Sequence, residues 1–392
     1  MAEKKEFYFL GKAPLSKSLL NRALIIRGWF PDFDIQGTSS CDDIQIMTKA
    51  LENPSAKIIN CGLSASAFRF LALYLSRKGG EYFLTGQPAL LNRQMQELPM
   101  ILSQLGVSAI KEEKGWQISS EGWKPQGDYV NIPYKTTSQY ASGLLLSGWN
   151  LKRDLFFALN RNQVSFAHFK MTLDFVQQLG MDVKSEGTEY CIPAGQTLQV
   201  FHYKPEQDRN SLFALAALAA LTGKAVFSDW TDLSLQSEAV FPHILEKMGV
   251  SLKKENHTLS VFKTDHLKPL EMNLCSTPDL FPVLSVLCAK ANGTSRLSGL
   301  KHLAFKESHR LNQMEKLFQL SNIAVEKTED TFTIHGNTLR LSVKPFEFDG
   351  AGDHRIIMAA ALLKKIGVPI QITGKEAVSK SFPDFFKYIG PV

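Results

Sequence analysis

The stretch LSVLCAKANGTSRLSG, residues 284–299, decides the fold because it joins two elements in one phrase. Its first part, Leu284 to Gly293, is an apolar helix pattern that ends in glycine, and its second part, Ser295 to Gly299, is a strand pattern. We expect Gly293 to cap the helix in the left-handed conformation, which glycine adopts without a Cβ clash. The phrase therefore predicts a helix that leads directly into a strand, as in α/β folds.

The same phrase recurs along the whole chain. A short strand pattern follows each of the glycines that end an apolar helix pattern, and these glycines lie about 70 residues apart, at Gly79, Gly148, Gly223, Gly293 and Gly367. Gly28 begins a shorter sixth copy, and a second helix phrase, such as Phe241 to Gly249, alternates with the first. The pattern predicts six α/β repeats with two helices each.

Length and composition limit the class of protein. A chain of 392 residues with 44% hydrophobic and 21% charged residues is typical of a soluble globular protein with about two domains. The net charge of +6 is modest and evenly spread, which favours the attraction of small anions over nucleic-acid binding. The longest apolar stretch, Leu212 to Leu221, is far shorter than the roughly 20 residues that span a bilayer.

The cysteines and the N-terminus indicate a cytoplasmic protein. Five scattered cysteines without CxxC spacing are typical of reduced thiols. The N-terminus has charged residues before a short strand pattern, Phe7 to Leu10, and lacks the apolar region of a signal peptide. We therefore expect no export.

A charged motif follows the opening stretch. Lys306-Glu307-Ser308-His309-Arg310 places two cations around a carboxylate. A solvated charge run is the commoner meaning of such a cluster. However, further cations occur at other element boundaries: in Ser16-Lys17-Ser18 with Arg22, in Asp353-His354-Arg355 and at Lys380. Cations gathered from separate boundaries indicate a polyanionic substrate.

Two of these sites stand before helix patterns. Ser16-Lys17-Ser18 precedes Leu19 to Ile26, and Thr137-Ser138-Gln139 precedes Tyr140 to Leu146. Hydroxyls and free N–H groups at a helix start serve as caps, and they also bind phosphate. Each motif on its own is consistent with a helix cap or with a phosphate-binding site.

Two carboxylates are candidates for proton transfer. Asp279 follows Pro278 at the head of the apolar helix pattern Leu280 to Ala289, where the helix dipole stabilises a carboxylate. Cations beside Glu307 lower its proton affinity and burial raises it, so Glu307 is poised for acid–base work. The alternatives are a helix N-terminal charge for Asp279, a structural ion pair for Asp353-His354-Arg355 and a solvated lysine for Lys380.

Together, these motifs resemble the 5-enolpyruvylshikimate-3-phosphate synthase family, the 3-phosphoshikimate 1-carboxyvinyltransferases, over the whole length of the chain. Residues 16–24 are similar to the family's SKS-x-x-NRAL segment. The further matches, in the family's order, are Cys41-Asp42-Asp43, Thr137-Ser138-Gln139, Pro278-Asp279, Lys306 to Arg310 and Asp353-His354-Arg355.

The resemblance implies a particular fold and domain division. The expected fold is a two-lobed inside-out α/β barrel with six repeated βαβαββ-type units, three in each lobe. The first strand would belong to the C-terminal lobe, so this lobe comprises residues 1–14 and 207–392, and the N-terminal lobe residues 15–206. Hinge strands are expected near residues 12–15 and 204–208, with the substrate cleft between lobes that close upon binding.

The resemblance also implies a reaction: transfer of the carboxyvinyl group of phosphoenolpyruvate to the 5-hydroxyl of 3-phosphoshikimate, in the shikimate pathway to chorismate and the aromatic amino acids. We expect these two small molecules as partners, neither cofactor nor metal, no nucleic acid or membrane partner, and a monomer. Two alternatives remain: the sister enolpyruvyl transferase that acts on UDP-N-acetylglucosamine, and a catalytically degenerate paralogue that binds anions.

The family's site residues carry over by position. The implied catalytic residues are Asp279, Glu307 and Lys17. The residues implied for phosphoenolpyruvate are Lys17, Arg93, Gln139, Arg310, Arg355 and Lys380. The residues implied for 3-phosphoshikimate are Ser18, Arg22, Thr137, Ser138, Gln139, Ser165, Asp279, His302 and Lys306. We expect Arg69 to be structural.

The chain departs from the family at several positions. The family's NSGT or NAGT turn is replaced by Leu63-Ser64-Ala65-Ser66, so a side-chain amide is lost and a methyl group is added. Gln94 replaces a proline, His302 an asparagine and His309 an aspartate. These changes bear on binding strength more than on the type of reaction.

Overall fold

The computed structural model describes residues 6–53, 55–93, 95–133, 137–159, 166–337 and 344–392. Contacts divide the chain into two compact units. Unit 1 comprises Met1–Pro14 and Gln207–Val392, and unit 2 comprises Leu15–Glu206. The N-terminal strand β1 (Phe7–Gly11) belongs to unit 1 because it pairs in parallel with β12 (Gly223–Phe227).

Four sheets share one topology. Each has a parallel pair followed by two antiparallel strands, in the order β1-β12-β14-β13 and β15-β16-β18-β17 in unit 1, and β3-β4-β6-β5 and β7-β8-β10-β9 in unit 2. The other strands of these sheets in unit 1 are β13 (Leu252–Glu255), β14 (Thr258–Phe262), β15 (Glu271–Asn273), β16 (Thr294–Ser298), β17 (Val325–Lys327) and β18 (Phe332–His335). Those in unit 2 are β3 (Ile58–Asn60), β4 (Gly80–Thr85), β5 (Ser108–Glu112), β6 (Gly115–Ser120), β7 (Val130–Ile132), β8 (Leu155–Leu159), β9 (Lys184–Glu186) and β10 (Glu189–Ile192).

Each unit has a third, two-stranded parallel sheet. In unit 1 it pairs β19 (Phe346–Asp349) with β20 (Ile370–Thr373), and in unit 2 it pairs β2 (Asp34–Ile35) with β11 (His202–Tyr203). The four larger sheets follow the βαβαββ order along the chain, once β1 is counted with the strands that follow residue 207. The predicted α/β fold with six repeats, three in each unit, is confirmed.

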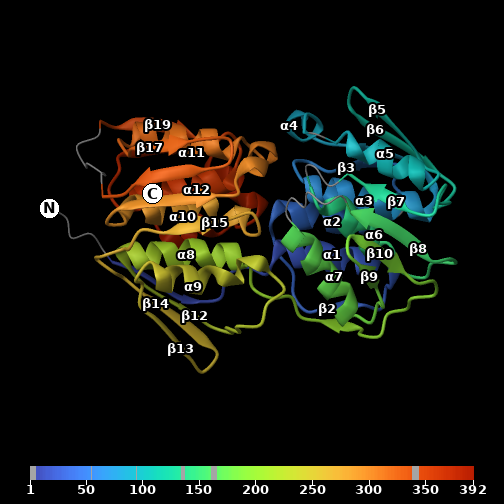
Figure 1. Ribbon diagram of the computed structural model, residues 1–392, viewed down its shortest axis with the longest axis horizontal. Coiled ribbons are helices and arrows are strands. Elements are labelled where there is room, and N and C mark those ends of the chain that lie inside the picture. Colours follow the sequence, from blue (N-terminus) through green and yellow to red (C-terminus); the bar gives the residue numbers. More distant parts are fainter. Residues whose placement is uncertain (1–5, 54, 94, 134–136, 160–165, 338–343) are drawn as a thin grey trace. The chain divides into compact units, whose positions relative to one another are not determined.

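The apolar helix phrases become the helices at the centre of each unit. In unit 1 these are α8 (Arg209–Thr222), α10 (Phe281–Lys290) and α12 (His354–Lys365), and in unit 2 they are α1 (Lys17–Trp29), α3 (Ala65–Lys78) and α6 (Gln139–Leu146). The three helices of each set contact one another, and sheet strands pack against them (Figure 1). Helices that are covered on all sides must be apolar all round, which explains their long hydrophobic runs.

The remaining helices are shorter or amphipathic. In unit 2 they are α2 (Asp42–Glu52), α4 (Pro88–Leu91), α5 (Glu97–Gln104) and α7 (Phe166–Gln178). In unit 1 they are α9 (Phe241–Lys247), α11 (Arg310–Leu320) and α13 (Phe385–Ile389), with the 3-10 turns η1 (Ser237–Val240), η2 (Pro278–Leu280), η3 (Lys301–Phe305) and η4 (Lys375–Lys380).

The glycines that follow the central helices serve two different purposes. Gly79, Gly293 and Gly367 have φ of 80°, 139° and 111°, a region that favours glycine. Of these three, only Gly79 is a C-cap: the C-cap of α10 is Ala291 and that of α12 is Ile366, so the expected cap at Gly293 is wrong. Ser147 takes the C-cap of α6 in place of Gly148. The expected left-handed conformation is also wrong at Gly223, the C-cap of α8, whose φ of 175° is extended. A Cβ atom there would lie 1.9 Å from the carbonyl oxygen of Phe7. Glycine is needed at this position because strand β1 approaches so closely.

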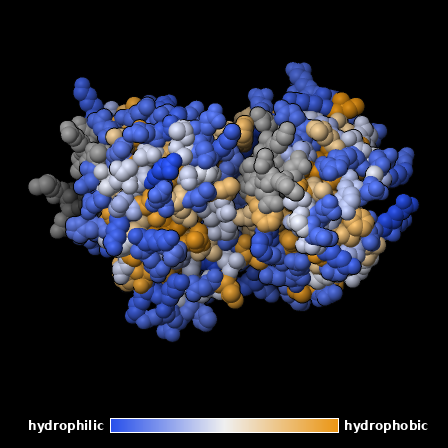
Figure 2. Space-filling view, in the orientation of Figure 1, coloured by the Kyte–Doolittle hydropathy of each residue, from blue (hydrophilic) through white to orange (hydrophobic). Residues whose placement is uncertain are grey.

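The surface is consistent with the composition. The displayed face of each unit is mainly hydrophilic, with small separate hydrophobic areas (Figure 2). Within the described residues, no helix has both the length and the apolar character needed to cross a membrane.

All five cysteine thiols are free, and burial raises the pKa of Cys61 and Cys288 to about 12.

Candidate active site

Arg310 is the centre of a charged cluster in unit 1. It is the first residue of α11, and its side chain is only 1% exposed. Its guanidinium donates from Nη1 to Asp279 Oδ1 at 2.8 Å and from Nη2 to Glu307 Oε2 at 2.9 Å. Nε donates to Asp353 Oδ2 at 2.8 Å. Burial alone would lower the pKa of Arg310, but the three carboxylates outweigh it and hold the pKa above its usual range.

Three further cations complete this cluster. Lys380 Nζ lies 3.0 Å from Glu307 Oε1, and Arg355 Nη2 donates to Asp279 Oδ2 at 2.8 Å. Lys306 Nζ lies 3.7 Å from Asp279 Oδ1. Each carboxylate oxygen of Asp279 and Glu307 therefore faces at least one cation. We call the set the acid–base cluster; its members are Asp279, Lys306, Glu307, Arg310, Asp353, Arg355 and Lys380.

Local structure explains how these side chains meet. Asp279 lies in η2, immediately before α10, so the expected α-helical start is a 3-10 turn. Asp353 is the N-cap of α12 and accepts the backbone N–H of Arg355 at 3.0 Å. Glu307 precedes α11 by three residues. The starts of three helices therefore bring the carboxylates of Asp279, Glu307 and Asp353 together. Free N–H groups at a helix start favour negative charge.

The charge balance of the acid–base cluster suits an anionic ligand. Four cations face three carboxylates, which leaves an excess of one positive charge. Lys306, Arg355 and Lys380 have side chains that are 21%, 11% and 8% exposed, so they are largely screened from water. Such guanidinium and ammonium groups form strong charge-assisted hydrogen bonds to carboxylate and phosphate.

His302 adds a neutral group near the cluster. It lies in η3 and is 6% exposed, and Nε2 has no hydrogen-bond partner among the described residues. Burial, with help from the nearby Lys306, lowers the pKa of His302 to about 4. The imidazole therefore carries no charge near neutral pH.

In unit 2, Lys17 is paired with an aspartate. Lys17 is the first residue of α1, after the N-cap Ser16, and its Nζ lies 2.8 Å from Asp43 Oδ2 on α2. The two side chains are 15% and 3% exposed. Sequence reasoning noted the Cys41-Asp42-Asp43 turn but gave Asp43 no role; the structure makes it the partner that orients Lys17.

Arg22 is held by groups of unit 2. Its Nε donates to Thr172 Oγ1 at 2.7 Å, and its Nη1 donates to the carbonyl oxygen of Ser18 at 2.7 Å. Nη2 donates to the carbonyl oxygen of His168 at 3.1 Å. Arg22 is 4% exposed, and its guanidinium lies 5.4 Å from the ring centroid of Phe70. The side chain is therefore preorganised. The sequence gave no signal for Thr172.

Gln139 is fixed by two residues of α3. Its Nε2 donates to Ser66 Oγ at 2.7 Å, and its Oε1 accepts from Arg69 Nη1 at 2.5 Å. Its backbone N–H donates to Thr137 Oγ1 at 3.2 Å, whereas the side chain of the N-cap Ser138 makes no cap bond. Arg69, expected to be structural, thus positions a predicted site residue. The spacing of Ser66 and Arg69, one turn apart on a helix, was the available signal.

The substituted turn at the start of α3 caps the helix. Ser64 is the N-cap and accepts the backbone N–H of Ala67 at 3.2 Å, and Ala65 is 5% exposed. Arg93 lies between α4 and α5, and its backbone N–H donates to the carbonyl of Leu90 at 3.0 Å. Ser165 and Gln94 lie outside the described residues.

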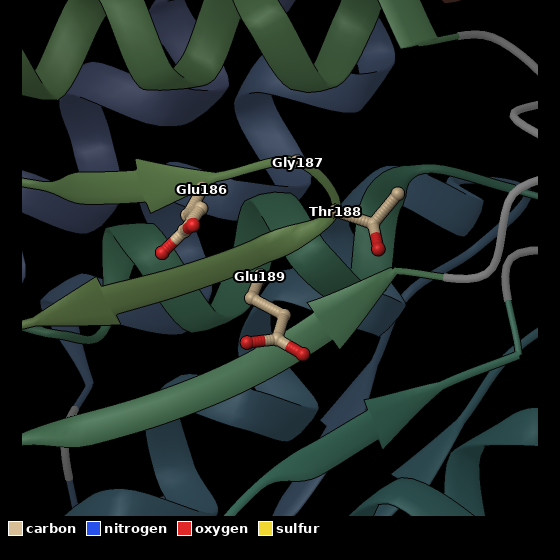
Figure 3. A pocket seen from close by; sticks show the side chains of 4 residues that line it. All are labelled: Glu186, Gly187, Thr188 and Glu189. Carbon is tan, nitrogen blue, oxygen red and sulfur yellow. The ribbon is translucent and has the colours of Figure 1, made fainter.

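A surface hollow in unit 2 has the wrong charge for this chemistry. It lies at the turn between β9 and β10 and is lined by Glu186, Gly187, Thr188 and Glu189 (Figure 3). Glu186 and Glu189 face each other across the antiparallel pair. No predicted site residue is among the described residues that line it, and two carboxylates repel a polyanion.

Comparison with known proteins gives a consistent result. The family model described as EPSP synthase (3-phosphoshikimate 1-carboxyvinyltransferase) matches residues 35–389. A 3-phosphoshikimate 1-carboxyvinyltransferase from Methanocorpusculum labreanum is 32% identical over 339 residues, 85% of this chain and 78% of the relative. One from Halobacterium salinarum is 28% identical, with 96% of this chain and 95% of the relative covered.

Solved structures share the fold. An EPSP synthase from Acinetobacter baumannii superposes with a TM-score of 0.74 at 22% identity, covering 98% of this chain and 95% of that chain. The enolpyruvyl transferase NikO from Streptomyces tendae superposes with a TM-score of 0.73 at 13% identity, covering 98% of this chain and 94% of that chain.

Proposed function

The chain belongs to the EPSP synthase family, and we infer that it is a 3-phosphoshikimate 1-carboxyvinyltransferase. It transfers the carboxyvinyl group of phosphoenolpyruvate to the 5-hydroxyl of 3-phosphoshikimate and releases inorganic phosphate, a step on the route to chorismate and the aromatic amino acids. The observation that carries the residue roles is the acid–base cluster, in which two carboxylates are held by buried cations.

The reaction needs three proton transfers. The methylene carbon of phosphoenolpyruvate gains a proton while the 5-hydroxyl loses one, and a C–O bond forms to give a tetrahedral intermediate. A proton then leaves the new methyl group as the bond to phosphate breaks. We assign the methylene proton to Glu307 and the 5-hydroxyl proton to Asp279, with Lys17 assisting.

The cations give Glu307 a way to change its proton affinity. In the structure Arg310 and Lys380 hold its two oxygens, which favours the charged form. When an anionic substrate takes over part of their charge, their attraction for Glu307 weakens and the protonated form becomes more favourable. The same cations stabilise the negative charge that develops on the departing phosphate.

Substrate binding is assigned to the predicted residues. For phosphoenolpyruvate we propose Lys17, Arg93, Gln139, Arg310, Arg355 and Lys380. For 3-phosphoshikimate we propose Ser18, Arg22, Thr137, Ser138, Gln139, Ser165, Asp279, His302 and Lys306. Arg22 and His302 support the second set. Arg22 is buried and held by hydrogen bonds, and His302 is buried with Nε2 left without a hydrogen-bond partner among the described residues. A cytoplasmic location and a monomeric state remain predictions.

A phosphate-release assay tests the function. The protein is incubated with phosphoenolpyruvate and 3-phosphoshikimate together, with each substrate alone, and with UDP-N-acetylglucosamine as the alternative acceptor. We expect release only with the first pair. Release with UDP-N-acetylglucosamine would assign the chain to the sister reaction. Binding of 3-phosphoshikimate without any release would favour the degenerate paralogue, which the Leu63-Ser64-Ala65 turn would then explain.

A further inference from the structure

Glu238 is a buried carboxyl group to which the reaction above gives no role. It lies in η1 and is 3% exposed, and its Oε1 is buried with no hydrogen-bond partner among the described residues. A buried, ionised carboxylate is destabilising when one of its oxygens lacks a hydrogen bond. The protonated form avoids most of this cost, so the surroundings of Glu238 favour a neutral acid.

The neighbours of Glu238 belong to the acid–base cluster. One of its carboxyl oxygens lies within 4.8 Å of a carboxylate oxygen of Asp279. Asp279 already forms ion pairs with Arg310, Arg355 and Lys306, so it is the ionised member of this carboxyl pair. A second negative charge at this distance would be repelled, and two such carboxyls share a proton more readily than they both ionise.

Other charged groups do not offset this repulsion. Burial is the largest influence and raises the pKa of Glu238 to about 7; Asp279 and Asp208 raise it as well, and a hydrogen bond from its own backbone and the charge of Arg355 oppose them. Asp208 is the N-cap of α8. The neighbouring Arg209 is directed elsewhere: its Nη2 donates to the carbonyl of Thr231 at 2.7 Å and its guanidinium lies 4.3 Å from the ring centroid of Trp230.

Helix α9, which follows η1 directly, supplies no compensating cation. Its buried residues are Phe241, Pro242, Ile244 and Leu245. Its charged groups Glu246 and His243 have side chains that are 53% and 62% exposed, and Lys247 is also exposed.

We propose that Glu238 is a positioning residue whose protonated form beside Asp279 preserves the positive excess with which the acid–base cluster receives its anionic substrates. This inference rests on the proposed function. With Glu238 neutral, four cations face three carboxylates. Ionised Glu238 would cancel the excess and would compete with Asp279 for the guanidinium of Arg355. Glu238 acts through these two residues and needs no contact with substrate.

The test compares the parent with Glu238→Gln, which fixes the side chain in an uncharged form of nearly the same shape. Glu246→Gln, the same change at an exposed site on the next helix, is the matched control. For each protein, kcat/KM for phosphoenolpyruvate is measured from about pH 6 to about pH 8.5, a range that spans the titration of Glu238. Ratios between proteins cancel the ionisation of the substrates themselves.

We expect Glu238→Gln to match the parent near pH 6 and to exceed it on the order of tenfold near pH 8.5, where the parent's Glu238 is mostly ionised. Glu246→Gln should follow the parent throughout. A constant ratio of Glu238→Gln to parent across the whole range would overturn the proposal.

A second measurement on the parent does not depend on the variant or on activity. Infrared spectra of protein with 13C-labelled glutamate reveal the C=O stretch of a protonated glutamic acid. We expect this band at about pH 6 and expect it to disappear as the pH rises through about 7. Absence of the band at about pH 6 would overturn the inference even if Glu238→Gln failed to fold. A titrating band in a protein that releases no phosphate would leave Glu238 protonated and refute the proposed function.

Discussion

Lys380 Nζ lies 3.0 Å from Oε1 of Glu307, although 73 residues separate the two in the sequence. Arg310 binds the other oxygen of the same carboxylate at 2.9 Å. Glu307 is therefore held between two buried cations that an anionic substrate can engage. This arrangement makes Glu307 a stronger candidate for proton transfer than a carboxylate exposed to water.

Replacing Glu307 with Gln should lower kcat by roughly a hundredfold or more, because a general acid–base group is lost. Binding of 3-phosphoshikimate should change little, since the amide keeps the shape of the carboxylate. Turnover by phosphate release and binding by calorimetry measure the two effects. Glu329→Gln, at a side chain that is 87% exposed, is the control. Equal turnover in Glu307→Gln and the parent would remove Glu307 from the mechanism.

Arg310→Met should destabilise unit 1 strongly. The change keeps the bulk of the side chain but leaves the buried Asp353 and its neighbouring carboxylates without their shared cation, a loss of about 3 to 5 kcal/mol. The matched control is Arg296→Met, because Arg296 is 56% exposed and lies 3.6 Å from Glu271. We expect less than about 1 kcal/mol there. Calorimetric unfolding with similar losses in both variants would contradict the central role of Arg310.

His302→Asn should make the protein more stable in acid. The pKa of His302 is lowered from 6.5 to about 4, so below pH 6.5 the unfolded chain binds a proton that the folded protein resists. Stability from this group is complete above pH 6.5 and is lost as the pH falls toward 4, by roughly 2 to 3 kcal/mol. Thermal unfolding of parent and variant at several pH values measures the difference. A difference that does not grow as the pH falls would show that His302 is charged in the fold.

Ala65→Gly should strengthen inhibition by glyphosate, which occupies the phosphoenolpyruvate site in the family. Ala65 is buried at the first position of α3, where its methyl group stands in place of the family's glycine. A clash of about 2 kcal/mol confined to the inhibitor would weaken it roughly thirtyfold. The inhibition constant is compared with the phosphoenolpyruvate KM in both proteins. Tight inhibition of the parent, or no gain in Ala65→Gly, would refute this explanation.

The repeats could be predicted from the sequence because each central helix is covered on all sides. Burial forces a continuous apolar run, and the close approach of strands requires glycine after it, as at Gly223 beside Phe7. The resulting phrase is visible in the amino-acid order alone. The period of this phrase predicted the order of helices and strands correctly, but it predicted the conformation of the individual glycines less well.

The site could be predicted only where charge stands in a compact motif. Lys306 to Arg310 is such a motif, and its residues do converge on Asp279. Glu238 escaped notice because it precedes α9 in a segment that resembles an ordinary helix start. Its character comes from burial and from Asp279 and Arg355, which lie far away in the sequence. Local patterns do not record such contacts.

Mass spectrometry of the product formed from phosphoenolpyruvate and 3-phosphoshikimate tests the assigned reaction. We expect 3-phosphoshikimate that carries one added carboxyvinyl group, together with an equal amount of inorganic phosphate, and far less of both with Glu307→Gln. Unchanged 3-phosphoshikimate after prolonged incubation with a folded protein that binds it would refute the assignment.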